Sequence, residues 1–192
     1  MLEEEYQPRR KLPDHLKKQP EPERAFEFSI RDAVAADLPT IRAIYNHYVL
    51  NTVVTFDEQP MTLRALRQKF TNAKRLGMPY LVAASPTGQI LGYAYVYPWK
   101  EKAAYRYTVE NSIYLGPAST GKGLGKALLA ALIERSKEAG LKEIIAVIAD
   151  KGAEGSIALH KSFGFTDGGH MGKVGFKFDR WIGTVLMQKS LK

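Results

Sequence analysis

The sequence predicts one α/β domain built around a mixed β-sheet, and three observations support this prediction. A length of 192 residues with 45% hydrophobic content suits a single domain with its own core. Residues 108–149 have the pattern of a strand, a glycine-rich loop, an amphipathic helix and a second apolar strand, which is typical of parallel pairing. The apolar segments 80–85 and 90–99 flank the turn Pro86-Thr87-Gly88, which is typical of an antiparallel hairpin.

The first 25 residues differ in composition from the rest of the chain. They contain four prolines together with six basic and six acidic side chains. Such a segment buries too little apolar surface to offset the entropy that ordering costs. We therefore expect residues 1–25 to form a flexible extension and residues 26–192 to form the folded domain.

The predicted elements follow from helix and strand signals along the chain. Asp37 followed by Pro39 is a typical helix start, and Gly77 and Gly140 each follow a helical pattern. In chain order we expect a strand at 26–33, a helix from Asp37, a helix at 63–76, strands at 80–85, 90–99 and 108–115, a helix from Leu124 to Gly140, a strand at 143–149, a helix at 156–163 and a strand at 181–190.

Composition excludes several classes of function. The chain has no cysteine, which rules out disulfides, thiolate metal sites and a cysteine nucleophile. No segment reaches the roughly 20 apolar residues of a membrane span, so we expect a cytoplasmic protein without a membrane partner. The net charge of +8 suits a phosphate-bearing ligand. No nucleic-acid-binding module is recognisable, so nucleic acid is not an expected partner.

The glycine-rich segment 121–126, GKGLGK, carries the most chemical information. Its glycines let the backbone approach an anion, and the amides at the start of the following helix favour phosphate oxygens. A turn that needs only positive φ is one alternative. A dinucleotide fingerprint fails because Lys126 stands where its third glycine is required. A nucleotide-binding P-loop at 116–122 remains the other alternative, although Gly123 replaces the hydroxyl residue that would bind magnesium.

A further interpretation of this loop is an acyl-CoA site, because the sequence resembles the GNAT superfamily of N-acetyltransferases. Gly123 and Gly125 match the pyrophosphate loop of that superfamily, whereas Thr120 departs from its usual first residue. Within the superfamily, residues 28–190 resemble the phosphinothricin and methionine-sulfoximine acetyltransferases. The matching segments, in order, are IRDAVAADLPTIRAIYNHYV, GYAYVYPWK, YRYTVENSIYL, LHKSFGF and KVGFKFDRW.

The resemblance implies a mostly antiparallel sheet with a central parallel strand pair, flanked by helices. It also implies acetyl-CoA as cosubstrate and a splayed strand near Tyr114 whose amides face the acetyl group. The cofactor-binding residues expected on this basis are Ile113, Tyr114, Leu115, Gly121, Lys122, Gly123, Leu124, Gly125, Lys126 and Ser156.

Acetylation of an amine requires a base, because the amine is protonated at neutral pH. Glu110 lies within the strand that precedes the loop, and the resemblance implies that it is this base, acting directly or through water. His160 occupies the position where the resemblance places a residue that could protonate the departing thiolate. The histidines and carboxylates have no metal-ligand spacing, so we expect no metal.

The carboxylate of an amino-acid substrate needs a cation. Lys100, Tyr105 and Arg106 lie just before the strand that carries Glu110, and we expect them to bind the substrate. The segment KVGFKFDRW, interpreted as a loop at 173–181, is a candidate to close the pocket. The resemblance also implies a homodimer. The predicted function is transfer of an acetyl group from acetyl-CoA to the amine of a small amino-acid-like substrate.

Overall fold

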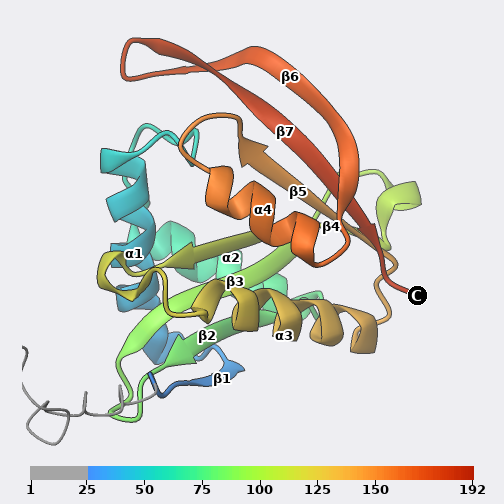
Figure 1. Ribbon diagram of the computed structural model, residues 1–192. Coiled ribbons are helices and arrows are strands. Elements are labelled where there is room, and N and C mark those ends of the chain that lie inside the picture. The colour runs from blue at the N-terminus through green and yellow to red at the C-terminus, as the bar shows by residue number, and fades with distance from the viewer. Residues whose placement is uncertain (1–25) are drawn as a thin grey trace, which may run out of the picture.

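The computed structural model describes residues 26–192, so the prediction for the segment 1–25 lies outside the described residues. A seven-stranded sheet with the order β1-β2-β3-β4-β5-β7-β6 runs through the molecule, and helices cover both of its faces (Figure 1). The strands are β1 (Ser29–Asp32), β2 (Tyr80–Ala84), β3 (Ile90–Pro98), β4 (Thr108–Leu115), β5 (Glu143–Ala149), β6 (Thr166–Lys177) and β7 (Arg180–Ser190). The helices are α1 (Leu38–Asn51), α2 (Leu63–Arg75), α3 (Leu124–Glu138) and α4 (Glu154–Ser162), with single 3₁₀ turns at η2 (Ala35–Asp37), η3 (Ala103–Tyr105) and η4 (Pro117–Ser119).

Every neighbouring pair of strands is antiparallel except β4 and β5, which confirms the predicted fold class. The parallel ladder is short: its three residue pairs run from Thr108 opposite Glu143 to Glu110 opposite Ile145. Beyond Glu110, β4 continues to Leu115 paired only with β3, while β5 continues to Ala149 paired only with β7. The two central strands therefore diverge after Glu110, as the family resemblance implied.

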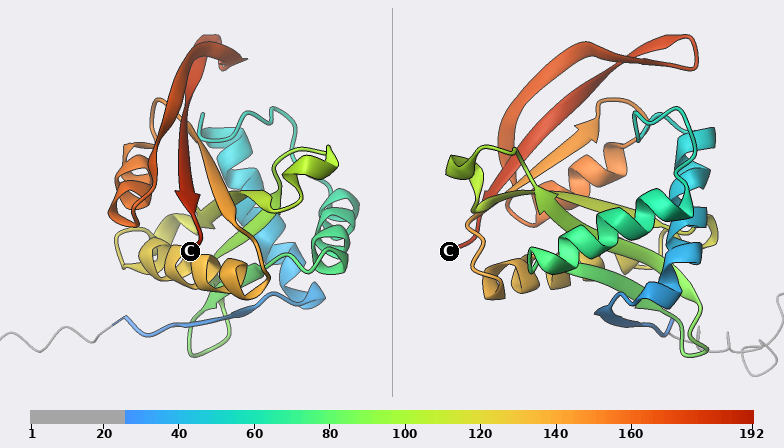
Figure 2. Two further views of the ribbon diagram at one scale, coloured as in Figure 1. Left: turned by 90° about the vertical axis from the view of Figure 1, so that its right-hand side faces the viewer. Right: turned by 180° about the vertical axis from the view of Figure 1, so that it is seen from behind.

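The alternation of side chains along β2, β3 and β4 divides the core between the two faces of the sheet. One face carries Leu81, Ala94 and Val109 and packs against α3, whose own leucines are fully buried. The opposite face carries mainly tyrosines. The helices α1 and α2 cover this face, as the view from behind shows (Figure 2). The leucine face and the tyrosine face thus present different chemistry to the divergent ends of β4 and β5.

The strand β6 was not predicted, and the interpretation of residues 173–181 as a loop was wrong. Residues 173–177 belong to β6, which pairs with β7 to form a hairpin that projects beyond the body of the domain (Figures 1 and 2). The segment TDGGHMGKVGFK contains four glycines and is almost entirely exposed, so it has neither strand propensity nor apolar alternation. Two register shifts accommodate the glycines, and pairing with β7 makes the strand.

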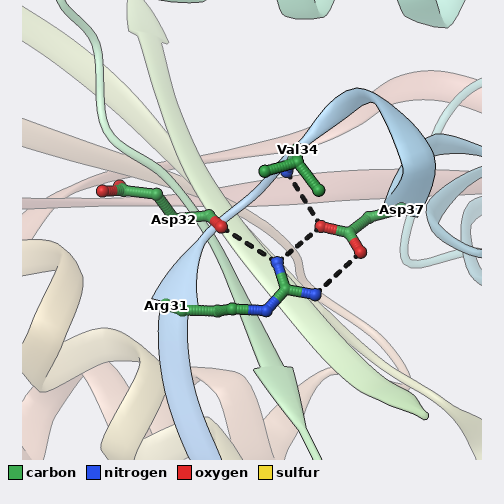
Figure 3. Close-up of polar contacts among 4 residues, drawn as sticks. All are labelled: Arg31, Asp32, Val34 and Asp37. Atoms are coloured by element: carbon green, nitrogen blue, oxygen red, sulfur yellow. Dashed lines mark hydrogen bonds and ion pairs between the residues drawn. The ribbon is translucent and has the colours of Figure 1, made fainter. Parts of the chain in front are cut away.

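An ion pair fastens the first strand to the start of α1 (Figure 3). Arg31 donates from Nη1 and Nη2 to the two carboxylate oxygens of Asp37, at 2.7 and 2.8 Å. The backbone N–H of Val34 donates to the same carboxylate at 2.9 Å. Asp37 is buried, whereas the Arg31 side chain is 40% exposed, so solvent screens part of the interaction. The bonds from Arg31, aided by Val34, hold the pKa of Asp37 below its ordinary value.

Replacing Asp37 with alanine should lower the free energy of unfolding by about 1–3 kcal/mol at pH 7, because a bidentate pair and a backbone partner are lost together. The lowered pKa makes this contribution complete above pH 3.8, the ordinary pKa, and it fades as the pH falls through the folded value. Urea denaturation should therefore show a gap between the variant and the wild type at pH 7 that narrows at pH 3. Asp32→Ala, at an exposed pair with Arg135, is the matched control and should change little.

Candidate functional site

A cavity of about 770 Å³ opens where β4 and β5 diverge. Its walls come from the free edges of the two strands, from the loop before α3, from the start of α4 and from the segment after α1. The residues that line it include Glu110, Asn111, Tyr114, Gly121, Gly123 and Ser156, together with Thr55, Phe56 and Thr184. The cavity therefore joins the two faces of the sheet at the point where Glu110 ends the parallel ladder.

The loop before α3 presents unpaired amides to this cavity. Gly121 and Gly123 adopt φ values of +74° and +78°, which residues with a Cβ rarely adopt. The first helical bond runs from the N–H of Ala127 to the carbonyl of Gly123, so the amides of residues 124–126 have no partner within the helix. The N-cap residue of this helix is Gly123, which has no side chain to accept from these amides. Free amides at the positive end of a helix dipole form a binding site for an anion such as a pyrophosphate.

Glu110 is half-buried at the fork between the strands. Burial raises the pKa of its carboxyl above the ordinary value, and the ammonium groups of Lys69 and Lys100 oppose this rise. A carboxylate with a raised pKa is a better proton acceptor than an ordinary one, provided that it remains ionised at the working pH. Glu110 thus has the position and the electrostatic environment of a general base.

His160 lies behind the cavity wall, and Asn111 separates it from the cavity. Its Nδ1 lies 2.8 Å from the carbonyl oxygen of Ser156, which can only accept, so Nδ1 carries the proton. Its Nε2 lies 2.9 Å from the amide nitrogen of Asn111 and accepts from it. Burial lowers the pKa of the ring, against a smaller effect of the Ser156 carbonyl. In this arrangement the neutral imidazole directs no proton toward the cavity.

The tyrosine face of the sheet forms the other side of the cavity. Tyr114 packs against Tyr45, Tyr48 and Tyr93, with ring centroids 5.3–5.4 Å apart. Tyr48 also donates from its hydroxyl to the carbonyl of Leu115, at 2.8 Å, and so fixes the free end of β4. Rigid aromatic packing keeps the unpaired edge of β4 in place without a neighbouring strand.

Most of the residues predicted for the cofactor line the same cavity. They are Ile113, Tyr114, Leu115, Gly121, Gly123, Gly125, Lys126 and Ser156, and Glu110 lies with them. Lys122 and Leu124 are not on its wall. The Lys122 ammonium donates to the carbonyl of Ala118 within its own loop, and the Leu124 side chain is fully buried in the core. Only the backbone of Leu124 remains free to contact an anion.

The three residues predicted to bind the substrate lie away from this cavity. Lys100 is exposed, and its ammonium stands 4.6 Å from the centroid of the Trp99 ring. Tyr105 lies in η3 and is 41% exposed. Arg106 follows it, donates to the carbonyl of Ala103 and stacks on Tyr107. Their role in substrate binding remains a prediction.

Sequence reasoning missed Lys69 and Phe56. Lys69 falls in the apolar stripe of α2 formed by Leu66, Phe70 and Ala73, and a lysine at such a position is the signal that would have identified it. Phe56 lines the main cavity and also a second one of about 600 Å³ beneath the β6–β7 hairpin. A Cβ atom at Gly175 would lie 2.5 Å from the Phe56 ring, so the hairpin and this ring are in close contact.

Within residues 26–192, no helix is long and apolar enough to cross a membrane. Over the same range, no cluster of three or more histidine, aspartate or glutamate side chains has an arrangement suited to a metal ion.

The fold and the cavity agree with comparisons to known proteins. Residues 41–165 match the model of the acetyltransferase (GNAT) family, and the chain therefore belongs to that family of enzymes. No comparison supports the alternative of a nucleotide-binding P-loop at 116–122. In the structure Lys122, the lysine of that motif, donates to the carbonyl of Ala118 in its own loop.

Two relatives and one solved structure show which members of the family this chain is similar to. The chain is 45% identical to an L-methionine sulfoximine/L-methionine sulfone acetyltransferase from Pseudomonas aeruginosa, over 85% of this chain and 94% of the relative. It is 42% identical to a phosphinothricin N-acetyltransferase from Alcaligenes faecalis, over 81% and 78% of the two chains. The crystal structure of a phosphinothricin acetyltransferase from Sinorhizobium meliloti in complex with acetyl-CoA matches with a TM-score of 0.82 and 45% identity, over 85% and 88%.

Proposed function

We propose that this enzyme transfers the acetyl group of acetyl-CoA to the amine of a small amino-acid-like substrate, with Glu110 as the general base. The observation that supports this proposal most directly is the divergence of β4 from β5. It opens a cavity that contains unpaired helix amides on one side and a half-buried carboxylate on the other. The relatives named for methionine sulfoximine and phosphinothricin support the substrate class.

The loop and the free edge of β4 have separate roles in this proposal. The amides of residues 124–126 bind the pyrophosphate of acetyl-CoA, which supplies the activated acetyl group as a thioester. In the ladder with β3, Tyr114 stands at a hydrogen-bonded pair with Tyr93, whereas the Leu115 amide points away from β3. The Leu115 amide donates to the thioester oxygen, where negative charge develops during the reaction. Preorganised donors of this kind are effective because they need no rearrangement as the charge appears.

Glu110 accepts a proton from the substrate ammonium, directly or through water, and the neutral amine then attacks the thioester carbon. The C–N bond forms and the C–S bond breaks, and the second proton that the nitrogen loses in becoming an amide passes, directly or through water, to the departing CoA thiolate. Holding the amine beside the thioester supplies much of the acceleration, so no covalent enzyme intermediate is needed. A cytoplasmic location and a homodimer remain predictions from the sequence.

The purified protein should acetylate methionine sulfoximine or phosphinothricin, with one thiol released from acetyl-CoA per molecule of product. Thiol release and mass spectrometry of the product measure the two sides of this balance. A panel of ordinary amino acids, together with methionine sulfone, ranks the acceptors. Folded protein that transfers acetyl to none of these amines would contradict the proposed substrate class.

Gly123→Ala should weaken acetyl-CoA binding by about tenfold or more, the equivalent of one lost hydrogen bond to a charged group. The added methyl group imposes strain at φ +78° and tilts the amides of the first turn. Gly140→Ala is a matched control, because Gly140 has φ +77° at the other end of α3 and no atom near its Cβ position. Calorimetry should show weak binding for the first variant only. Equal binding by both would show that Gly123 serves only the turn.

Glu110→Gln should reduce kcat by about 10²–10⁴-fold, the usual contribution of general-base catalysis, while acetyl-CoA binding stays near normal. The raised pKa of Glu110 places its proton uptake on the acidic limb of the pH–rate profile, so this limb should change in the variant. Steady-state kinetics across pH, with binding measured separately, test both points.

His160→Ala provides the comparison for this experiment. If His160 were the base, this variant would lose turnover at neutral pH and Glu110→Gln would behave almost like the wild type. Near-normal turnover of Glu110→Gln would thus eliminate the assignment of Glu110.

A further inference from the structure

We infer that Lys69 is a positioning residue for the general base, and that its ammonium keeps the half-buried Glu110 carboxylate charged. This inference rests on the proposed role of Glu110. Lys69 extends from α2 onto the tyrosine face of the sheet and belongs to none of the sequence segments that match the acetyltransferases.

Lys69 and Glu110 both lie against the tyrosines of β3. Tyr97 stands directly opposite Glu110 in the antiparallel ladder, so the two side chains share the tyrosine face. The Lys69 ammonium lies 5.7 Å from the centroid of the Tyr97 ring and 4.8 Å from that of Tyr95. It also donates to the Tyr95 hydroxyl, at 2.8 Å. Two rings and one hydroxyl therefore hold the ammonium on the face that carries Glu110.

Lys69 is charged although it is half-buried. Burial lowers its pKa, but the Tyr95 hydroxyl and the carboxylates of Asp57 and Glu110 outweigh that effect, so the pKa stands above its ordinary value. Within residues 26–192, no carboxylate oxygen lies within ion-pair distance of its ammonium. The Lys69 ammonium thus acts on the Glu110 carboxylate from a distance and does not form a contact ion pair with it.

The other charged groups around Glu110 do not replace this effect. Lys100, from the segment after β3, also favours the charged carboxylate, but it is exposed and therefore screened by salt. Asp57, from the segment after α1, carries a charge of the same sign as Glu110 and acts on Lys69. On β5, Ile145 faces Glu110, and the neighbouring Glu143 binds Gln188 and Ser190. Of the charges that offset the desolvation of Glu110, Lys69 has the largest effect.

A direct test follows the titration of the Glu110 carboxyl by ¹³C NMR in the full-length protein without substrate, with the signal assigned by its loss in Glu110→Gln. Lys69→Met removes the charge and keeps most of the side-chain length, so the Glu110 midpoint should move to higher pH. Lys69→Arg should restore it. Lys74→Met is the matched control, because Lys74 lies on the same helix over the Phe70 ring, and it should leave the midpoint unchanged.

The kinetic constants should rank the variants in the same order as their Glu110 midpoints. Well below the midpoint, kcat/KM of Lys69→Met should fall about three- to tenfold relative to the wild type, and the deficit should shrink at high pH. Ionisation of the substrate amine affects all variants equally and cancels in this ratio. Circular dichroism establishes whether each variant is folded. If Lys69→Met is not folded, Lys69→Arg keeps the test valid.

An unchanged Glu110 midpoint in Lys69→Met would overturn the inference. The inference would also be overturned if the deficit of Lys69→Met in kcat/KM were independent of pH and came only from KM for the amino acid. That pattern identifies a residue that anchors the substrate. Neither outcome affects the proposed function, which Glu110→Gln tests alone. Normal activity of Glu110→Gln would remove the base, whatever Lys69 does to its titration.

Discussion

The site depends on one interruption of backbone hydrogen bonding, at the point where β4 and β5 part after three residue pairs. A continuous parallel ladder would satisfy the facing edges of both strands and leave no space between them. The interruption is maintained from outside: β3 pairs with the whole of β4, β7 pairs with the whole of β5, and Tyr48 fixes the end of β4. The cavity is thus a property of the sheet and its flanking contacts.

The two faces of the sheet divide the chemistry of the site. The face that packs against α3 meets the start of that helix, where free amides suit an anion. The opposite face is aromatic and contains the carboxylate and the ammonium that bear on proton transfer. Because Glu110 is the last residue of β4 that pairs with β5, the proposed base stands at the junction of these two environments.

Local patterns in the sequence predicted the elements that hold the site but not the contacts made between them. Alternation in TVENSIYL and the apolar run EIIAVIA gave the bounds of β4 and β5, and glycine spacing identified the loop. The strand β6 escaped prediction because its glycines remove both propensity and alternation, and only pairing with β7 forms it. The bond between Asn111 and His160 joins residues 49 positions apart, which no local pattern can reveal. Lys69 was overlooked among the other cations of α2, although its place in the apolar stripe distinguishes it.

The close contact between Gly175 and Phe56 restricts which residue position 175 can hold without moving the Phe56 ring. Phe56 forms part of the wall between two cavities, and the hairpin approaches it so closely that only glycine leaves the ring undisturbed. A single methyl group at position 175, remote in sequence from the base and the loop, would move that wall. The hairpin therefore limits the shape of the main cavity, although it lies outside the loop and the two strands that form most of the wall.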